Sequence, residues 1–438
     1  MNAHRTQVIS LAHPVYFSLL ASVAAGIINT VWVSRFGGPA VAAVAVATNT
    51  ENVLLGVALV FGSGTTVLVA HARGAGDAGA VRAAVRGGWA AWALLTPVVV
   101  VGGFVLREPL ARLVLDGGPA QSLAVGYFAI SLPGMAVFFA QQLVDGIFKG
   151  AGDTRTPMRL ALLAGGLILV CDPFLIRVHG VQGAAASTVL CRSVALVVGL
   201  VALRRNRLLR AAGEAPSARS LAGAARRTLR TGLPMSADFT VRQGGALVLV
   251  AIVARLGVTA VAAYSIAYKV MYVATMGFYA VRQAASLHTA HLLGAGQDAR
   301  RAIGRQAVLV AGAFAVAAAV LLGVTAPGIM AAFGAGPDVA HAGVLFLRCI
   351  GPYLLLMACF IALGGVFEGS GGAPVLLRVT VLGTAVQLPL AYGLSGLGLP
   401  GVCLALAVAM GVQCAVVLVV FRRARRQEGS DVSVVRVA

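Results

Sequence analysis

Residues 71–78 read HARGAGDA, and residues 291–298 read HLLGAGQD. The two stretches share the pattern His-x-x-Gly-Ala-Gly and are separated by 220 positions. The same shift aligns further pairs without a gap, among them Pro14 with Pro234, Arg35 with Arg255 and Gly37 with Gly257. Later pairs follow a shift of 219, including Pro133 with Pro352 and Gly152 with Gly371. The sequence therefore predicts two copies of one structural unit.

The composition places both copies in a membrane. Of the 438 residues, 59% are hydrophobic and only 11% are charged, whereas a soluble domain carries about 25% charged residues. Apolar runs such as 160–176 and 307–329 approach the ~20 residues that cross a bilayer as a helix. We predict twelve transmembrane helices: 11–33, 40–70, 84–106, 121–148, 157–177, 181–203, 231–255, 261–290, 304–326, 340–367, 374–395 and 398–421.

Six helices per copy is an even number, so the second copy enters the membrane from the same side as the first. The predicted fold is all-α and polytopic, with two parallel six-helix repeats that rock against each other to give alternating access. We expect an N-terminal lobe (1–203), a basic cytoplasmic linker (204–230), a C-terminal lobe (231–421) and a basic cytoplasmic tail (422–438). The Gly-Ala-Gly phrase ends the second helix of each copy, where glycine permits a left-handed turn.

The net charge of +20 follows the expected topology. If both termini are cytoplasmic, most Lys and Arg residues lie on the cytoplasmic side, as the positive-inside rule requires. The tail stretch RRARR (422–426) has no interleaved aromatic residues, so a nucleic-acid partner is not expected. The expected partners are the lipid bilayer and a small organic substrate.

Four motifs resemble the multidrug and toxic compound extrusion (MATE) family. They are Pro14 with RFGGPAVAAVAVAT (35–48), GAGD (74–77), KGAGDTRTPM (149–158), and CDP (171–173) followed by GVQGAAAS (180–187). The stretch ADFTVRQGGAL (237–247) resembles the DinF-like branch. The resemblance implies a two-lobe fold and multidrug efflux by cation-coupled antiport. It also implies a bacterial inner (plasma) membrane protein without a cofactor other than the transported H+ or Na+. We expect a monomer.

One departure from the family concerns ion coupling. Family members often carry an aspartate in the first helix, but this sequence has Asn29 there, and Asn cannot carry a proton. Asp172 matches the family's other N-lobe acid. Glu51 lies in the polar cluster TNTEN (48–52), inside an otherwise apolar helix. Because ionisable groups within spans usually face a cavity or a partner, we predict that Asp172, Asn29 and Glu51 form the ion-coupling site.

The substrate site is predicted in the C-lobe. One helical stripe carries Tyr264, Tyr268, Tyr272, Thr275, Tyr279 and Arg282, with spacings of three or four residues. Tyrosines and an arginine suit an aromatic ligand with an acidic or hydrogen-bonding group. Lys269, Arg242 and Asp238 are the other candidates for this cavity. The alternative for the arginines is neutralisation by Asp238 or by backbone carbonyls, which would leave an ordinary organic-cation pump.

Two other functions compete with export. A lipid-linked precursor flippase has a similar two-lobe shape but needs a strongly basic central cleft, and the C-lobe bases keep this alternative open. A polytopic membrane enzyme needs clustered His and Asp or a nucleophile with its base. The histidines show no HExxH spacing and the loops are short, so we expect no catalytic residues and no bound metal.

Overall fold

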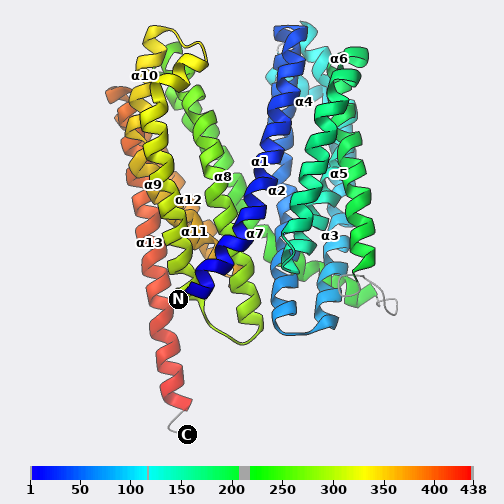
Figure 1. Cartoon of the computed structure of the whole chain (residues 1–438), viewed down its shortest axis with the longest axis vertical. Helices are drawn as coiled ribbons and strands as arrows, with labels where there is room; N and C mark the ends of the chain where they lie inside the picture. Colours follow the sequence, from blue (N-terminus) through cyan, green and yellow to red (C-terminus); the bar gives the residue numbers. More distant parts are fainter. Residues whose placement is uncertain (1, 116–117, 207–217, 436–438) are drawn as a thin grey trace. The chain divides into compact units, whose positions relative to one another are not determined.

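The computed structural model describes residues 2–115, 118–206 and 218–435, and these residues are almost entirely helical (Figure 1). The helices are α1 (Asn2–Val33), α2 (Gly38–Gly74), α3 (Ala78–Val105), α4 (Arg107–Val114), α5 (Gly118–Gly150), α6 (Arg155–Arg205), α7 (Ala218–Ala254), α8 (Val258–Gly294), α9 (Arg300–Ala332), α10 (Pro337–Cys349), α11 (Gly351–Gly369), α12 (Ala373–Leu394) and α13 (Gly398–Val435), with short 3-10 turns η1 (Ser34–Phe36) and η2 (Ser395–Leu397).

Ten segments of the described chain are long and apolar enough to cross a membrane. Two of them hold two of the expected spans each. The 51-residue α6 bends at Gly180, where φ is 58° and ψ is −136°, and the segment Ala373–Phe421 contains both α12 and α13. The predicted twelve-helix fold is therefore confirmed. The helix expected at 340–367 is broken at Ile350, because Pro352 lacks the N–H that would continue the ladder.

The turns of the backbone show the same duplication as the sequence. Ten described glycines have positive φ, and they form five pairs at matching turns of the two halves: Gly37 with Gly257, Gly76 with Gly296, Gly118 with Gly334, Gly152 with Gly371 and Gly180 with Gly398. Side chains with a Cβ disfavour this region of φ. The left-handed turn expected from Gly-Ala-Gly is present in both halves, with φ of 69° at Gly76 and 73° at Gly296.

The first glycine of each Gly-Ala-Gly phrase has a different role, which is to let two helices touch. A Cβ on Gly74 would collide with the carbonyl oxygen of His291, and a Cβ on Gly294 would collide with that of His71. The ends of α2 and α8 therefore pack backbone against backbone in a reciprocal contact. Glycine is required in both copies because the missing side chain of each one leaves room for a backbone carbonyl of the other copy.

The chain divides into two compact units. One consists of Met1–Ile9, Asp238–Ala285 and Arg300–Ala438, and the other of Ser10–Ala237 and Ser286–Ala299. The start of α7 and the end of α8 thus pack with the helices of the first half. The division into lobes at 203 and 231 stays a prediction. Part of the expected linker (207–217) and the tail side chains from residue 422 onward lie outside what the structure describes.

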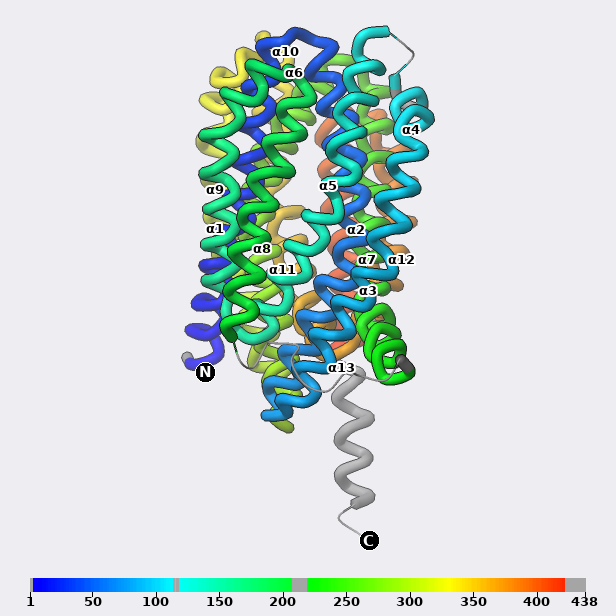
Figure 2. Tube along the Cα trace, turned by 90° about the vertical axis from the view of Figure 1, so that its right-hand side faces the viewer, coloured from blue at the N-terminus to red at the C-terminus, as the bar shows by residue number. Residues whose placement is uncertain are grey.

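In the unit Ser10–Ala237, α2, α3, α5 and α6 run side by side (Figure 2). Phe61 of α2 and Phe139 of α5 are fully buried and meet edge to face, with ring centroids 5.7 Å apart. One turn further, the Thr66 hydroxyl donates to the Gly146 carbonyl at 3.0 Å. Small residues and single interhelical hydrogen bonds of about 0.6 kcal/mol are the usual means of holding helices together in lipid.

Candidate functional site

Asn29 and Asp172 meet in the interior of the unit Ser10–Ala237. The Asn29 Nδ2 atom of α1 donates to Asp172 Oδ2 of α6 at 3.5 Å. Asp172 is fully buried and Asn29 is 7% exposed. The Ser187 hydroxyl lies near the Asp172 carboxylate, but neither it nor Asp172 Oδ1 forms a direct hydrogen bond in the described chain. The two residues thus lie together as expected, and the site retains free polar atoms.

Glu51 lies in the same unit but faces a different neighbour. Its carboxylate is close to the Ser131 hydroxyl of α5 and within electrostatic range of Arg192 on α6. Within the described ranges, no direct bond joins Glu51 to Asn29 or Asp172. The phenol of Tyr127 lies within electrostatic range of both acids and of Arg192.

Arg192 and Tyr127 were not assigned to the site by sequence reasoning. Arg192 is half-buried, and its guanidinium stacks over the ring of Phe138 at 4.6 Å. The position of Arg192 inside the predicted span 181–203 could have indicated its role, because a charged residue within a span needs a partner. Tyr127 gave no signal, because a buried tyrosine in an apolar helix resembles a packing residue.

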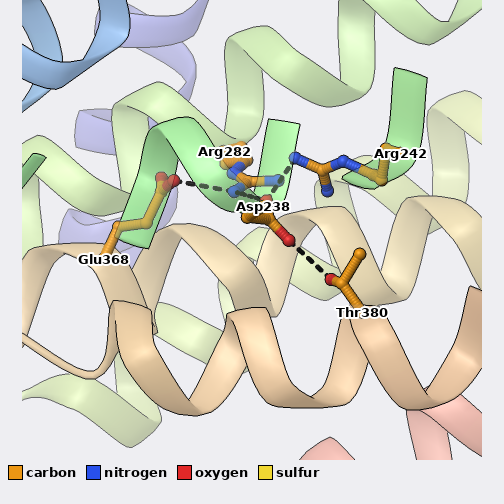
Figure 3. A network of polar contacts seen from close by, with 5 residues as sticks. All are labelled: Asp238, Arg242, Arg282, Glu368 and Thr380. Carbon is orange, nitrogen blue, oxygen red and sulfur yellow. Dashed lines mark hydrogen bonds and ion pairs between the residues drawn. The ribbon is translucent and has the colours of Figure 1, made fainter. Parts of the chain in front are cut away.

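In the other unit, a network of charged side chains on α7, α8 and α11, extended by a threonine of α12, joins four helices (Figure 3). Asp238 of α7 pairs through Oδ2 with Arg242, one helical turn away, and with Arg282 of α8 at 3.0 Å. Arg282 also pairs with Glu368 of α11 at 2.7 Å. The Thr380 hydroxyl of α12 donates to Asp238 Oδ1 at 2.5 Å.

This network balances two carboxylates with two guanidinium groups. Asp238 is 1% exposed and Arg282 is 4% exposed, so neither charge is solvated by water. A buried charge is tolerable only when it is paired and hydrogen-bonded. Arg282 pairs with two acids through Nη2, while its Nη1 atom and the Nε and Nη1 atoms of Arg242 are buried with no partner in the described chain. Glu368 was missed because the predicted helix ended at residue 367.

The tyrosines of α8 form a stack that runs from the core to the surface. Tyr264 is 3% exposed and meets Phe346 edge to face at 5.4 Å. Tyr268 stacks between Tyr264, at 5.7 Å, and Tyr272, at 6.5 Å. Tyr272 is 43% exposed and therefore ends the stack with a free ring face.

The remaining predicted substrate residues occupy different surroundings. The Thr275 hydroxyl donates to the Tyr272 carbonyl at 2.7 Å, so it is satisfied within its own helix. The Arg242 guanidinium lies 5.9 Å from the ring centroid of Tyr279. Tyr353 of α11, which the sequence did not indicate, is within electrostatic range of Tyr268, Tyr279 and Arg242. Lys269 is exposed and one position off the stripe.

Comparison with known proteins bears on the whole chain. The family model MatE matches residues 14–174 and again residues 234–393, which are the two repeats. A probable multidrug resistance protein NorM of Thermotoga maritima is 25% identical over 405 residues, covering 89% of this chain and 85% of that protein. A probable multidrug resistance protein YpnP of Bacillus subtilis is 23% identical and covers 67% of this chain and 66% of that protein.

Solved structures show the same fold. A MOP superfamily transporter from Pyrococcus furiosus superposes with a TM-score of 0.88 at 22% sequence identity, covering 96% of both chains. The reported binding pocket of that protein has reverse polarity, which was taken to suggest a different function. The relatives are transporters rather than enzymes, and the DinF-like assignment stays a prediction. With both repeats matched and the fold reproduced over nearly its whole length, this chain belongs to the MatE family of membrane transporters.

Proposed function

We propose that this protein is a secondary active exporter of organic compounds, driven by cation antiport with alternating access. The observation that carries the proposal is the buried Asn29–Asp172 pair, which provides one carboxylate in a span with one oxygen free to take a cation. The naming of NorM and YpnP relatives as multidrug resistance proteins supports organic substrates. We place the protein in a bacterial plasma membrane, as a monomer with both termini cytoplasmic.

The coupling site holds a single acid at its centre. Asn29 donates to Asp172 Oδ2, and the amide adds no charge, so one H+ or one Na+ neutralises the pair. Ser187, whose hydroxyl is buried and unpaired in the described chain, would supply an oxygen to either ion. We propose that Glu51 takes part indirectly, through Tyr127, because its own charge faces Arg192. Coupling of one cation per cycle follows from this arrangement.

We propose that the substrate binds at the exposed end of the tyrosine stack. Tyr272 offers a free ring face, and Arg242 offers two unpaired donors beside Tyr279. A planar aromatic body with a hydrogen-bond acceptor fits these groups. Arg282 pairs with Asp238 and Glu368, which neutralise its charge. It therefore does not repel organic cations from the site.

The flippase alternative has less support. It requires free positive charge in the C-half, but Arg242 and Arg282 are both paired with acids. The family match and the named relatives point instead to export of organic molecules.

The test is transport in vesicles reconstituted with the purified full chain. An H+ gradient and a Na+ gradient are imposed separately, and export of a fluorescent aromatic compound is recorded. We expect one gradient alone to drive export and the other to have no effect. Export that requires neither gradient, or that requires ATP, would contradict the proposal.

A further inference from the structure

We propose that a groove between the start of α1 and the start of α9 binds the phosphate of an anionic membrane lipid. The groove has a volume of about 350 Å³ and is lined by His4, Arg301, Ala302, Arg305 and Gln306. All five residues belong to one compact unit, so the groove does not depend on how the two units are arranged.

The residues that line the groove include two arginines and no acid. Arg301 and Arg305 are exposed and one helical turn apart, a spacing at which like charges repel. In the described ranges of the chain, neither forms an ion pair with an acid. They also lie at the start of α9, where the helix dipole is positive and cations are disfavoured. A bound phosphate would relieve both effects.

Gln306 gives independent support for a ligand. Its side chain is only 6% exposed, yet it lines the groove, and no hydrogen bond to its amide is formed within the described ranges. The amide opens onto the groove, so a ligand bound there can reach it. A phosphate oxygen in the groove would accept from the amide N–H.

Comparison of the two repeats shows a difference in packing at the place that Gln306 occupies. The buried residues Ile303, Gly304, Gln306 and Ala307 of α9 match Ala84, Val85, Gly87 and Gly88 of α3 at a shift of 219. In the first half, Gly87 lies so close to α7 that a Cβ would come within 2.7 Å of the Ala224 carbonyl oxygen. Gln306, a longer polar residue, occupies the corresponding place in α9.

The surroundings favour a lipid over a free phosphate ion. The face of α9 that carries Arg301 and Arg305 continues at helical spacing with Leu309, Val316 and Val320, which are 54%, 53% and 61% exposed. This face therefore has a charged end followed by an apolar surface, as a phospholipid has. Basic pockets at the ends of transmembrane helices bind anionic head groups in this way.

The proposal is tested by thermal unfolding of the detergent-solubilised full chain. The probes are short-chain phosphatidylglycerol, short-chain phosphatidylcholine and inorganic phosphate. We expect phosphatidylglycerol to raise the unfolding temperature in a saturable manner. In the double variant Arg301→Gln/Arg305→Gln, its apparent affinity should fall about thirtyfold. The control Arg226→Gln/Arg230→Gln removes two exposed arginines of the same spacing outside the groove, and its affinity should stay within a factor of two.

A third variant, Gln306→Gly, introduces the residue of the other repeat and should also weaken phosphatidylglycerol binding. Equal stabilisation by inorganic phosphate, or by phosphatidylcholine, would overturn the assignment to an anionic lipid. Equal weakening in the control variant would show a general charge effect instead of a site. None of these measurements depends on transport, so the outcome is independent of the proposed export function.

Discussion

Arg282 Nη2 lies 2.7 Å from Glu368 Oε1, and this ion pair ties α8 to α11 inside one unit of the transporter. Because Arg282 simultaneously pairs with Asp238, removal of the guanidinium would leave Glu368 without this ion pair and Asp238 with Arg242 as its remaining guanidinium partner. Arg282 is therefore a structural centre of the second half as well as a candidate near the substrate site.

We expect Arg282→Leu to lower the free energy of unfolding by about 3–5 kcal/mol, which is the typical cost of breaking a buried ion pair. Thermal unfolding in detergent measures this loss. The double variant Arg282→Leu/Glu368→Gln should recover a large part of it, since Asp238 then remains paired with Arg242. If the double variant is less stable than the single one, the pairing does not explain the effect.

Gly74→Ala and Gly294→Ala should each destabilise the protein by about 1–3 kcal/mol, because the new Cβ meets a carbonyl oxygen of the crossing helix. Gly166→Ala is the matched control, since a Cβ there has no neighbouring atom within 4 Å and alanine favours the helix. The same unfolding assay compares all three. Unequal effects at Gly74 and Gly294 would contradict the reciprocal packing.

Asp172→Asn should abolish gradient-driven export while leaving binding of a fluorescent aromatic substrate unchanged, since the amide cannot take up a proton and has no negative charge to balance Na+. Asn29→Asp is the matched variant. It adds a second carboxylate beside Asp172 and should raise the number of cations exchanged per substrate. Ion flux and substrate flux measured in the same vesicles give this ratio. Undiminished export by Asp172→Asn would remove Asp172 from the coupling site.

Tyr272→Ala and Tyr264→Ala separate binding from packing in the tyrosine stack. Tyr272 is 43% exposed, so its loss should change stability by less than about 0.5 kcal/mol but weaken aromatic substrates by roughly two- to tenfold. Tyr264 is 3% exposed, and its replacement should destabilise the fold by about 3–5 kcal/mol. Substrate titration and thermal unfolding distinguish the two effects. A large stability loss at Tyr272 would place it in the core.

The helices and their duplication could be predicted because both leave periodic signals. Apolar runs of sufficient length require helices in lipid, and turn glycines such as Gly76 and Gly296 have a backbone conformation that other residues adopt poorly. The break at Ile350 and the short helix α4 were not predicted. Both depend on local competition between proline, polar residues and helix ends rather than on overall hydrophobicity.

Only part of the candidate site could be predicted from the sequence. Asp172 and Asn29 were found from their positions within apolar spans, and they are in contact. Their distance from Glu51, and the partnership of Arg282 with Glu368, depend on which faces of separate helices meet. Helical periodicity fixes the residues that share a face but leaves open the helix that the face contacts.

The paired glycines align the two halves, so a residue in one half can be compared with the residue at the equivalent position in the other. Three charged residues differ in this comparison. At a shift of 220, Asp238 corresponds to Ser18, Arg242 to Ser22 and Glu51 to Met271. These three ionisable groups thus have uncharged counterparts. The two halves therefore repeat the same backbone framework, but the polar groups of one half are not copies of those in the other.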